Sequence, residues 1–191
     1  DTVSIALMQN PQLQRPVVIR EAPRREHAFA LPGRIELELQ REHLNTWPYI
    51  DYGSLGVDRA RQQFAIAAGY VFDRHHTAGI MLGEKSFAME YYRIQNDSLY
   101  LFQQQPDLIY GGGFYRFSWQ VATGVVPEVT LQLGGSNLGP VLGGRIGIQL
   151  IPFDRVSIIL GANGALLGYR YKDKVFTSHS LGLSYGVRYR F

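Results

Sequence analysis

Residues 180–191, the last of the chain, read SLGLSYGVRYRF. Apolar side chains occupy every second position, namely Leu181, Leu183, Tyr185, Val187, Tyr189 and Phe191. The positions between them hold only small or cationic residues, namely Ser180, Gly182, Ser184, Gly186, Arg188 and Arg190. Because successive side chains of a strand point to opposite faces, this alternation predicts a β-strand with one continuous apolar face.

Similar segments recur upstream, separated by turn residues and without a helical period between them. They cover residues 34–40, 63–72, 77–92, 108–117, 125–133, 140–151 and 155–169. Together with the C-terminal segment they predict an all-β chain of about eight strands, which is the smallest even number used by transmembrane barrels. We therefore expect a closed antiparallel transmembrane β-barrel.

The expected connections differ in length between the two ends of this barrel. Short turns are predicted at 73–76, 118–122 and 152–154, and the opposite end carries loops at 43–60, 95–107, 134–139 and 171–177. Short periplasmic turns and longer outer loops are typical of outer-membrane barrels. The pattern predicts that both the N-terminus and the C-terminus are periplasmic.

The composition is compatible with this interpretation. The mean hydropathy is −0.11 and no run of about 18 apolar residues occurs, so a transmembrane helix is excluded while a barrel is not. There is no Cys, which excludes a disulfide framework and a Cys nucleophile. The net charge of +3 is spread along the chain without a basic block, so we expect no nucleic-acid partner.

Polar and charged residues share one face of the predicted strands. They are Glu36, Glu38, Gln40, Arg145, Gln149, Asn163, Arg188 and Arg190. An eight-strand barrel is only wide enough for its own side chains, and the first strand lies beside the last. We therefore expect charge pairing in the lumen between Glu36 and Glu38 on one side and Arg188 and Arg190 on the other, with Arg145 in the same lumen. Solvated charges of a soluble sheet are the alternative.

Aromatic residues gather near the predicted strand ends. One set lies toward the inner rim, namely Phe72, Phe117, Trp119, Phe153, Tyr189 and Phe191. The other lies toward the outer rim, namely Tyr91, Tyr92, Tyr100, Phe102, Tyr169 and Tyr171. Two such sets predict girdles at the two water–lipid interfaces, whereas core aromatics of a β-sandwich would not form two rims.

The ending LGLSYGVRYRF, the turn IPFDR and the Gly-rich hairpins resemble the small outer-membrane β-barrel family of OmpA-like and OmpX-like domains, especially its Bacteroidota-type members. The resemblance covers about residues 33–191. It implies the fold, a Gram-negative outer-membrane location and an assembly signal, read by the barrel-assembly machinery, in Tyr185, Val187, Tyr189 and Phe191. It implies no single activity, because small barrels serve as anchors, adhesins, lipid-modifying enzymes and subunits.

Residues 1–33 differ from the rest of the chain. They are polar, carry several Pro and Arg, and begin without the basic and apolar regions of a signal peptide, which we expect to have been removed. We divide the chain into an extended periplasmic segment, 1–33, and a barrel, 34–191. Residues that could contact a partner protein lie in this segment and in the first long loop, namely Val17, Val18, Trp47, Tyr49, Ile50 and Tyr52.

Candidate catalytic or metal-binding residues are few. His75 and His76 are adjacent in a predicted turn without a carboxylate at ligand spacing, so we expect no metal and no cofactor. Residues 178–180 read Ser-His-Ser, which resembles the chemistry of outer-membrane lipid deacylases, with Glu90 as the only carboxylate to nominate. Neighbours in a strand point apart, however. Residues 111–113, all Gly, lack the helix that a phosphate loop requires and predict close packing or a kink.

These observations predict a non-enzymatic integral outer-membrane barrel that acts as a membrane anchor or as an accessory subunit of a larger envelope complex. The expected partners are outer-membrane lipid and lipopolysaccharide, the barrel-assembly machinery and another envelope protein. Two alternatives stay open, a lipid-modifying enzyme of the lipid A deacylase type and a narrow pore.

Overall fold

The computed structural model describes residues 33–45, 62–87, 89–95, 98–104, 107–171 and 174–191. In this part of the chain every regular element is a strand. The strands are β1 (Ile35–Asn45), β2 (Gln62–Val71), β3 (His76–Ser86), β4 (Met89–Gln95), β5 (Ser98–Gln104), β6 (Asp107–Ser118), β7 (Val125–Ser136), β8 (Pro140–Leu150), β9 (Val156–Tyr171) and β10 (Lys174–Arg190). No described helix is long and apolar enough to cross a membrane.

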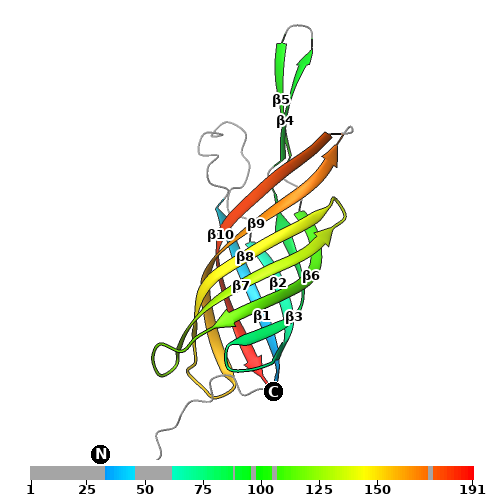
Figure 1. Ribbon diagram of the computed structural model, residues 1–191. Helices are drawn as coiled ribbons and strands as arrows, with labels where there is room; N and C mark the ends of the chain where they lie inside the picture. Colours follow the sequence, from blue (N-terminus) through cyan, green and yellow to red (C-terminus); the bar gives the residue numbers. More distant parts are fainter. Residues whose placement is uncertain (1–32, 46–61, 88, 96–97, 105–106, 172–173) are drawn as a thin grey trace, which may run out of the picture.

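Eight of the strands close into a barrel, in the order β1-β10-β9-β8-β7-β6-β3-β2 (Figure 1). All neighbours are antiparallel, and the barrel closes where β1 pairs with β10, with Glu36 opposite Arg190 and Glu38 opposite Arg188. The predicted closed antiparallel barrel of about eight strands is therefore confirmed. Because apolar and polar residues alternate in the C-terminal segment, β10 has one apolar and one polar face, and the barrel closes where this strand pairs with β1.

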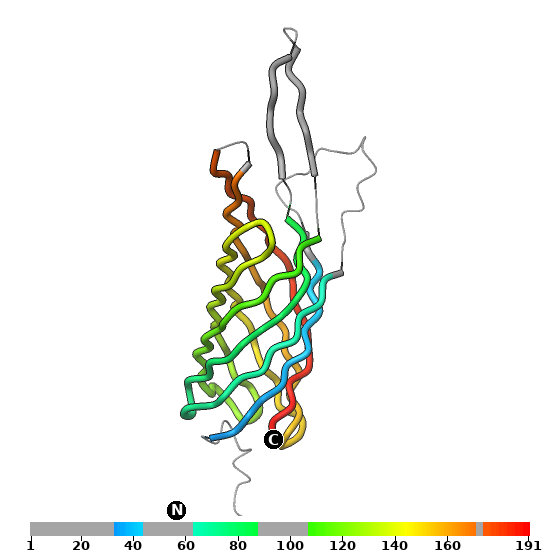
Figure 2. The backbone as a smooth tube through the Cα atoms, turned by 90° about the vertical axis from the view of Figure 1, so that its right-hand side faces the viewer, coloured from blue at the N-terminus to red at the C-terminus, as the bar shows by residue number. Residues whose placement is uncertain are grey.

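The two ends of the barrel differ, but only in part as the sequence predicted, because two of the four connections at the loop end, 137–139 and 172–173, are shorter than the turns at the other end. At one end, here called the terminal rim, the chain turns at residues 72–75, 119–124 and 151–155, and the described chain ends meet there, with Phe191 N donating to Ile35 O at 3.0 Å. Figure 2 shows β1 and the C-terminus side by side at this rim. The opposite end, the loop rim, carries the connections 46–61, 87–106, 137–139 and 172–173.

The turns of the terminal rim have identifiable local causes. The Asp73 carboxylate accepts hydrogen bonds from the backbone N–H groups of His75 at 2.7 Å and His76 at 2.9 Å, which closes the first turn. The bond from His75 contributes most to holding the pKa of the Asp73 carboxyl below its usual value. In the second turn the breaker is Gly124, which has a φ of +76° and accepts a hydrogen bond from Ile151 N at 2.8 Å.

The predicted strand 77–92 is wrong in its extent. Strand β3 ends at Ser86. Residues 89–95 form a strand of their own, β4, which pairs with β5 in a separate two-stranded sheet that lies in the chain between β3 and β6. The predicted loop 95–107 therefore contains a strand. The reason is visible at Lys85, Ser86 and Phe87, which are buried in succession. A single-layered wall buries only every second side chain, so the chain leaves the wall at this point.

Strands β9 and β10 are longer than the sequence predicted. The expected loop 171–177 is reduced to residues 172–173, because β9 continues to Tyr171 and β10 begins at Lys174. The rings of Tyr169 and Phe176 stack at 5.5 Å and support this extension. As a result the β9–β10 hairpin rises beyond β7 and β8 at the loop rim (Figures 1 and 2).

The glycine run 111–113 marks a close approach of two strands. Gly112 of β6 lies opposite Gly134 of β7. A Cβ atom added to Gly112 would overlap the Leu133 carbonyl oxygen and the Gly134 Cα atom, both of the neighbouring backbone. The predicted close packing is confirmed at Gly112. At Gly113, which lies on the outer face, a Cβ atom would meet only Gly79 O at an ordinary 3.6 Å.

We expect Gly112→Ala to lower the free energy of unfolding by about 1–3 kcal/mol, because the backbone of β7 has to move to make room for the methyl group. Gly113→Ala is the matched control and should change it by less than about 0.5 kcal/mol. Urea unfolding of the barrel in lipid vesicles measures both. Equal effects of the two substitutions would contradict the close approach.

Candidate functional site

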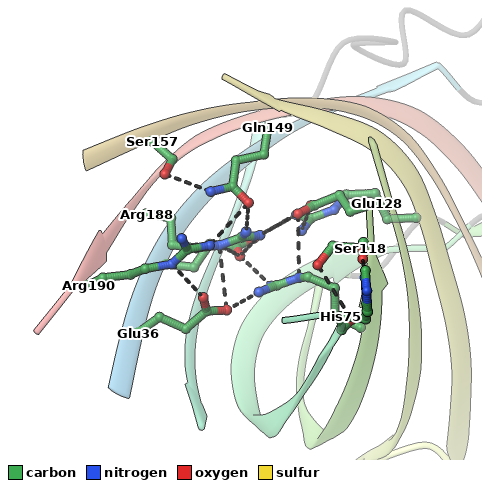
Figure 3. A network of polar contacts seen from close by, with 11 residues as sticks. Glu36, His75, Ser118, Glu128, Gln149, Ser157, Arg188 and Arg190 are labelled. Atoms are coloured by element: carbon green, nitrogen blue, oxygen red, sulfur yellow. Dashed lines mark hydrogen bonds and ion pairs between the residues drawn. The ribbon is translucent and has the colours of Figure 1, made fainter. Parts of the chain in front are cut away.

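The lower half of the lumen, toward the terminal rim, holds a continuous set of ion pairs and hydrogen bonds. We call it the lumenal charge network. It consists of Glu36 and Glu38 from β1, Arg116 from β6, Glu128 from β7, Arg145 and Gln149 from β8, Ser157 from β9, and Arg188 and Arg190 from β10. Figure 3 shows Glu36, Glu128, Gln149, Arg188 and Arg190 of this network pointing toward one another across the lumen. Six strands are thus connected through their side chains.

Glu38 lies at the centre of this network. Its Oε1 accepts a hydrogen bond from Arg145 Nη1 at 2.6 Å. Its Oε2 accepts from Arg116 Nη2 at 2.5 Å and from Arg188 Nη2 at 2.7 Å. The carboxylate is only 4% exposed, so these three guanidinium groups replace water as its hydrogen-bonding partners.

Glu128 and Glu36 extend the network on either side of Glu38. Glu128 is fully buried and accepts from Arg145 Nη2 at 2.7 Å and from Arg188 Nη2 at 2.9 Å. Glu36 contacts Arg116, and Arg190 Nε lies 3.5 Å from its Oε2. Each carboxylate therefore serves several guanidinium groups, which is the arrangement that a buried charge requires.

Uncharged residues complete the network at the β8–β9–β10 side. Arg188 Nη1 donates to Gln149 Oε1 at 2.6 Å, and Gln149 Nε2 donates to Ser157 Oγ at 2.7 Å. These contacts fix the amide of Gln149 with its oxygen toward the arginines. The network thus connects side chains of opposite walls of the lumen at this level.

The structure brings together all five residues that the sequence nominated for lumenal pairing: Glu36, Glu38, Arg145, Arg188 and Arg190. It does not place them as solvated charges of a soluble sheet, because each is at most 5% exposed. Sequence reasoning missed Arg116 and Glu128. The same alternation would have found Arg116, which stands between the outward-facing Tyr115 and Phe117.

The upper half of the lumen, toward the loop rim, is of mixed character. Lys85 Nζ lies 3.1 Å from Glu42 Oε2 and 5.8 Å from the centroid of the Tyr110 ring, and this ion pair was also missed. Around it lies a cluster of buried hydrophobic residues, namely Ala65, Ala67, Met81, Phe87, Leu108, Tyr110, Phe114, Val141, Ala165 and Leu167. Large side chains and a buried ion pair thus occupy this level.

The outer surface of the barrel is apolar over its whole circumference. Every barrel strand contributes exposed large hydrophobic side chains, and among the most exposed are Ile80, Leu82, Ile109, Leu131, Leu133, Ile146, Leu166 and Leu183. A barrel that binds a ligand in water has the opposite arrangement, with apolar residues inside. Exposed apolar surfaces of this extent do not persist in water, so the surrounding solvent is hydrocarbon.

The aromatic residues predicted for the inner rim all lie exposed around the terminal rim, on strands or turns that end there. They are Phe72, Phe117, Trp119, Phe153, Tyr189 and Phe191. The outer girdle is wrong for Tyr91, Tyr92, Tyr100 and Phe102, because they belong to β4 and β5, which are not part of the barrel wall. Tyr169 is half-buried, and the side chain of Tyr171 lies outside the described residues.

The Ser-His-Ser triplet does not form a catalytic pair by itself. Ser178 and Ser180 are buried on the lumenal face of β10, whereas His179 is exposed on the outer face. Glu90 lies in β4, and its side chain is outside the described part. His43 and His76 also lie on the outer side, where each stacks on a tyrosine, so the described strands place no histidine in the lumen.

His75 and His76 serve the turn and its surroundings. The ring Nδ1 of His75 lies 2.8 Å from Ser118 O, and the ring Nδ1 of His76 lies 2.5 Å from the Tyr115 hydroxyl. Within the described ranges no group of three or more His, Cys, Asp or Glu side chains could hold a metal ion.

The remaining candidate residues divide into two groups. Tyr185, Val187, Tyr189 and Phe191 are exposed on the outer face of β10 and its end, beside the seam with β1. Val17, Val18, Trp47, Tyr49, Ile50 and Tyr52 lie outside the described residues.

Comparisons with known proteins show likeness in fold. The barrel is similar to a de novo designed transmembrane β-barrel, with a TM-score of 0.50, 11% identity and coverage of 84% of this chain and 98% of that one. It is equally similar to Neisserial surface protein A, with a TM-score of 0.50, 16% identity and coverage of 82% of this chain and 97% of the other. No protein-family profile matches the chain, and no curated protein matches it.

Proposed function

We propose that this chain is an integral outer-membrane protein whose barrel acts as a membrane anchor or as an accessory subunit of a larger envelope complex, with both termini in the periplasm. The two long connections of the chain, 46–61 and 87–106, both lie at the loop rim, whereas all three turns at the terminal rim are short, and this supports the orientation. The exposed aromatic residues of β10 and Phe191 would then face the assembly machinery and the inner leaflet.

The observation that carries the proposal is the closed lumen. The lumenal charge network joins six strands, and its charged members are at most 5% exposed. Side chains held in several ion pairs narrow the path through the lumen at this level and are engaged with one another. An interior engaged in this way favours anchoring over transport.

Single-channel recording in planar bilayers tests the closed lumen. We expect the folded protein to insert without stepwise conductance, because the paired arginines and carboxylates block the path. Stable conductance steps from the purified monomer would favour the narrow pore instead.

The lipid-modifying enzyme is the second candidate, and only residues 178–180 favour it. Two single variants, His179→Ala and Ser180→Ala, separate the two functions when the lipid composition of each is measured by mass spectrometry. An anchor predicts unchanged lipids, whereas accumulation of an unprocessed lipid in both variants would establish the enzyme.

The subunit role is tested by gentle extraction followed by site-specific crosslinking. A photoreactive residue at Tyr49 or Val18 should yield one defined crosslinked envelope protein, while the same residue at Val121 in a terminal-rim turn serves as the comparison position. A barrel that remains alone at every position would remove the subunit role and leave the anchor.

A further inference from the structure

A second polar cluster lies in the lumen, nearer to the loop rim than the lumenal charge network. It consists of Gln40 and Glu42 from β1, Gln63 from β2, Lys85 from β3 and Tyr110 from β6, and we call it the Glu42 cluster. Each of these residues is at most 4% exposed. Lys85 connects the cluster, because its Nζ lies 3.1 Å from Glu42 Oε2 and 5.8 Å from the centroid of the Tyr110 ring.

Six buried polar atoms of the Glu42 cluster have no hydrogen-bond partner among the described residues. They are Gln40 Nε2, Glu42 Oε1 and Oε2, Gln63 Oε1 and Nε2, and the Tyr110 hydroxyl. The ion pair with Lys85 offsets the charge of Glu42, but it leaves the hydrogen-bonding capacity of the carboxylate unused. Because a buried carboxylate or amide without hydrogen bonds destabilises the folded chain, these atoms require a partner.

The cross-strand neighbours of Glu42 do not supply this partner. Glu42 lies directly opposite Gln63 on one side and Ser184 on the other. The Ser184 hydroxyl donates to Gly161 O at 3.4 Å instead. The side chains of Glu42 and Gln63 start from Cβ atoms about 4.5–5.5 Å apart, as in any antiparallel pair, yet they do not bond to each other. A small molecule that bonds to both would satisfy the carboxylate and the amide together.

The chemistry of the cluster indicates which small molecule this is. The two amide groups and the phenol hydroxyl offer donors, whereas the carboxylate and the Gln63 carbonyl offer acceptors. Glu42 and Lys85 carry opposite charges, so the cluster has no net charge with which to hold an ion. Water both donates and accepts hydrogen bonds. A buried water makes about three of them, so the six atoms match about two water molecules.

We propose that the Glu42 cluster binds a small group of ordered water molecules, which join β1, β2 and β6 through their side chains. This inference rests on the proposed closed lumen and names a ligand held inside it. Bound water supplies hydrogen bonds to these buried groups, as the arginines do for Glu38 nearer the terminal rim. Phe87 and Leu108 are buried in the same hydrophobic cluster as Tyr110, so exchange of this water with bulk water is slow.

Magic-angle-spinning NMR of the barrel in lipid bilayers tests the site, by transfer of magnetisation from water protons to side-chain amides. Gln63 is the probe. Gln149 is the matched control, because it is equally buried but its amide bonds directly to Ser157 and Arg188. We expect the transfer to Gln63 to build up several-fold faster than the transfer to Gln149. The variant Gln63→Met identifies the Gln63 signals by their loss, and heat-modifiable electrophoretic mobility shows that it is folded.

A second measurement separates bound water from polar groups that are left unpaired. Tyr110→Phe removes only the hydroxyl, and it should lower the midpoint of urea unfolding in vesicles, because a water-mediated hydrogen bond is lost. An unchanged or higher midpoint, or a transfer to Gln63 no faster than to Gln149, would overturn the proposal. So would a Gln63 signal that shifts when potassium chloride replaces sodium chloride, since it would show an ion in the site. The closed lumen fails separately, on stepwise conductance of the unmodified protein.

Discussion

Glu38→Ala is expected to lower the free energy of unfolding of the barrel by about 3–5 kcal/mol, because the substitution leaves buried guanidinium groups without their shared carboxylate. Arg116, Arg145 and Arg188 all donate to this carboxylate in the folded protein. Without it, three cations face one another in a narrow lumen with Glu36 and Glu128 as their remaining acidic partners. Urea titration in lipid vesicles, followed by tryptophan fluorescence, measures the change.

Glu84→Ala is the matched control for this prediction. Glu84 is a carboxylate on a barrel strand but is exposed on the outer face, so its loss should change stability by less than about 0.5 kcal/mol. The double variant Glu38→Gln/Arg188→Gln should be less destabilised than the sum of its single variants, since the two side chains bond directly. Equal stability of Glu38→Ala and Glu84→Ala would contradict a structural role for the network.

The second large effect is expected on the outer face. Ile146→Arg should cost about 2–4 kcal/mol in bilayers, because Ile146 lies near the middle of β8 and 69% of it is exposed to the surrounding solvent. The same substitution on a water-exposed strand would be nearly neutral. The unfolding free energy in vesicles, compared with that of the unmodified protein, gives the cost.

Val121→Arg supplies the depth control, since Val121 is an exposed apolar residue in a turn of the terminal rim. Its cost should fall to about 0–1 kcal/mol, the value for arginine near an interface. A cost at Ile146 no larger than that at Val121 would argue against hydrocarbon around the middle of the barrel.

The strand order and the lumenal side of the barrel could be predicted because alternation is a local property. The segment 180–191 alternates without an error, and closure of a barrel forces its neighbour to be the first strand, so Glu38 and Arg188 could be placed together from sequence alone. The further partners of Glu38 come from β6 and β8. Whether side chains of β6 and β8 reach Glu38 depends on how far each strand is shifted in register relative to the next around the barrel, and no local sequence pattern gives that shift.

The loop rim was predicted less well, for a related reason. No Gly, Pro or Asn interrupts the sequence between residues 84 and 92, so nothing local predicts that the strand ends there, and the sequence does not show that Lys85, Ser86 and Phe87 are all buried. Strand β3 therefore ends at Ser86, before the predicted end at residue 92. Conversely, Lys174 and its neighbours read as a polar loop, yet the stacking of Tyr169 on Phe176 extends β9 and β10. Tertiary contacts decide both cases.

The distribution of charged and apolar residues in the barrel is largely the reverse of that in a soluble protein. Charged residues supply the interior contacts through Glu38 and its arginines, and aliphatic residues such as Ile80 and Ile146 form the surface. Ion pairs stabilise the interior toward the terminal rim, hydrophobic packing stabilises it toward the loop rim, and lipid stabilises the outer surface. The ion pairs of the interior leave the outer face and the two rims of the barrel as the surfaces that its described residues present to other molecules.

The most direct test of this account is flotation without detergent. The purified chain, refolded in the presence of preformed lipid vesicles, should float with the lipid in a density gradient, resist extraction by carbonate and run as a heat-modifiable folded species. Vesicle-free samples diluted out of surfactant should aggregate. A folded, monodisperse chain in plain buffer, left at the bottom of the gradient, would show that water is the solvent of its outer face and would contradict the transmembrane barrel.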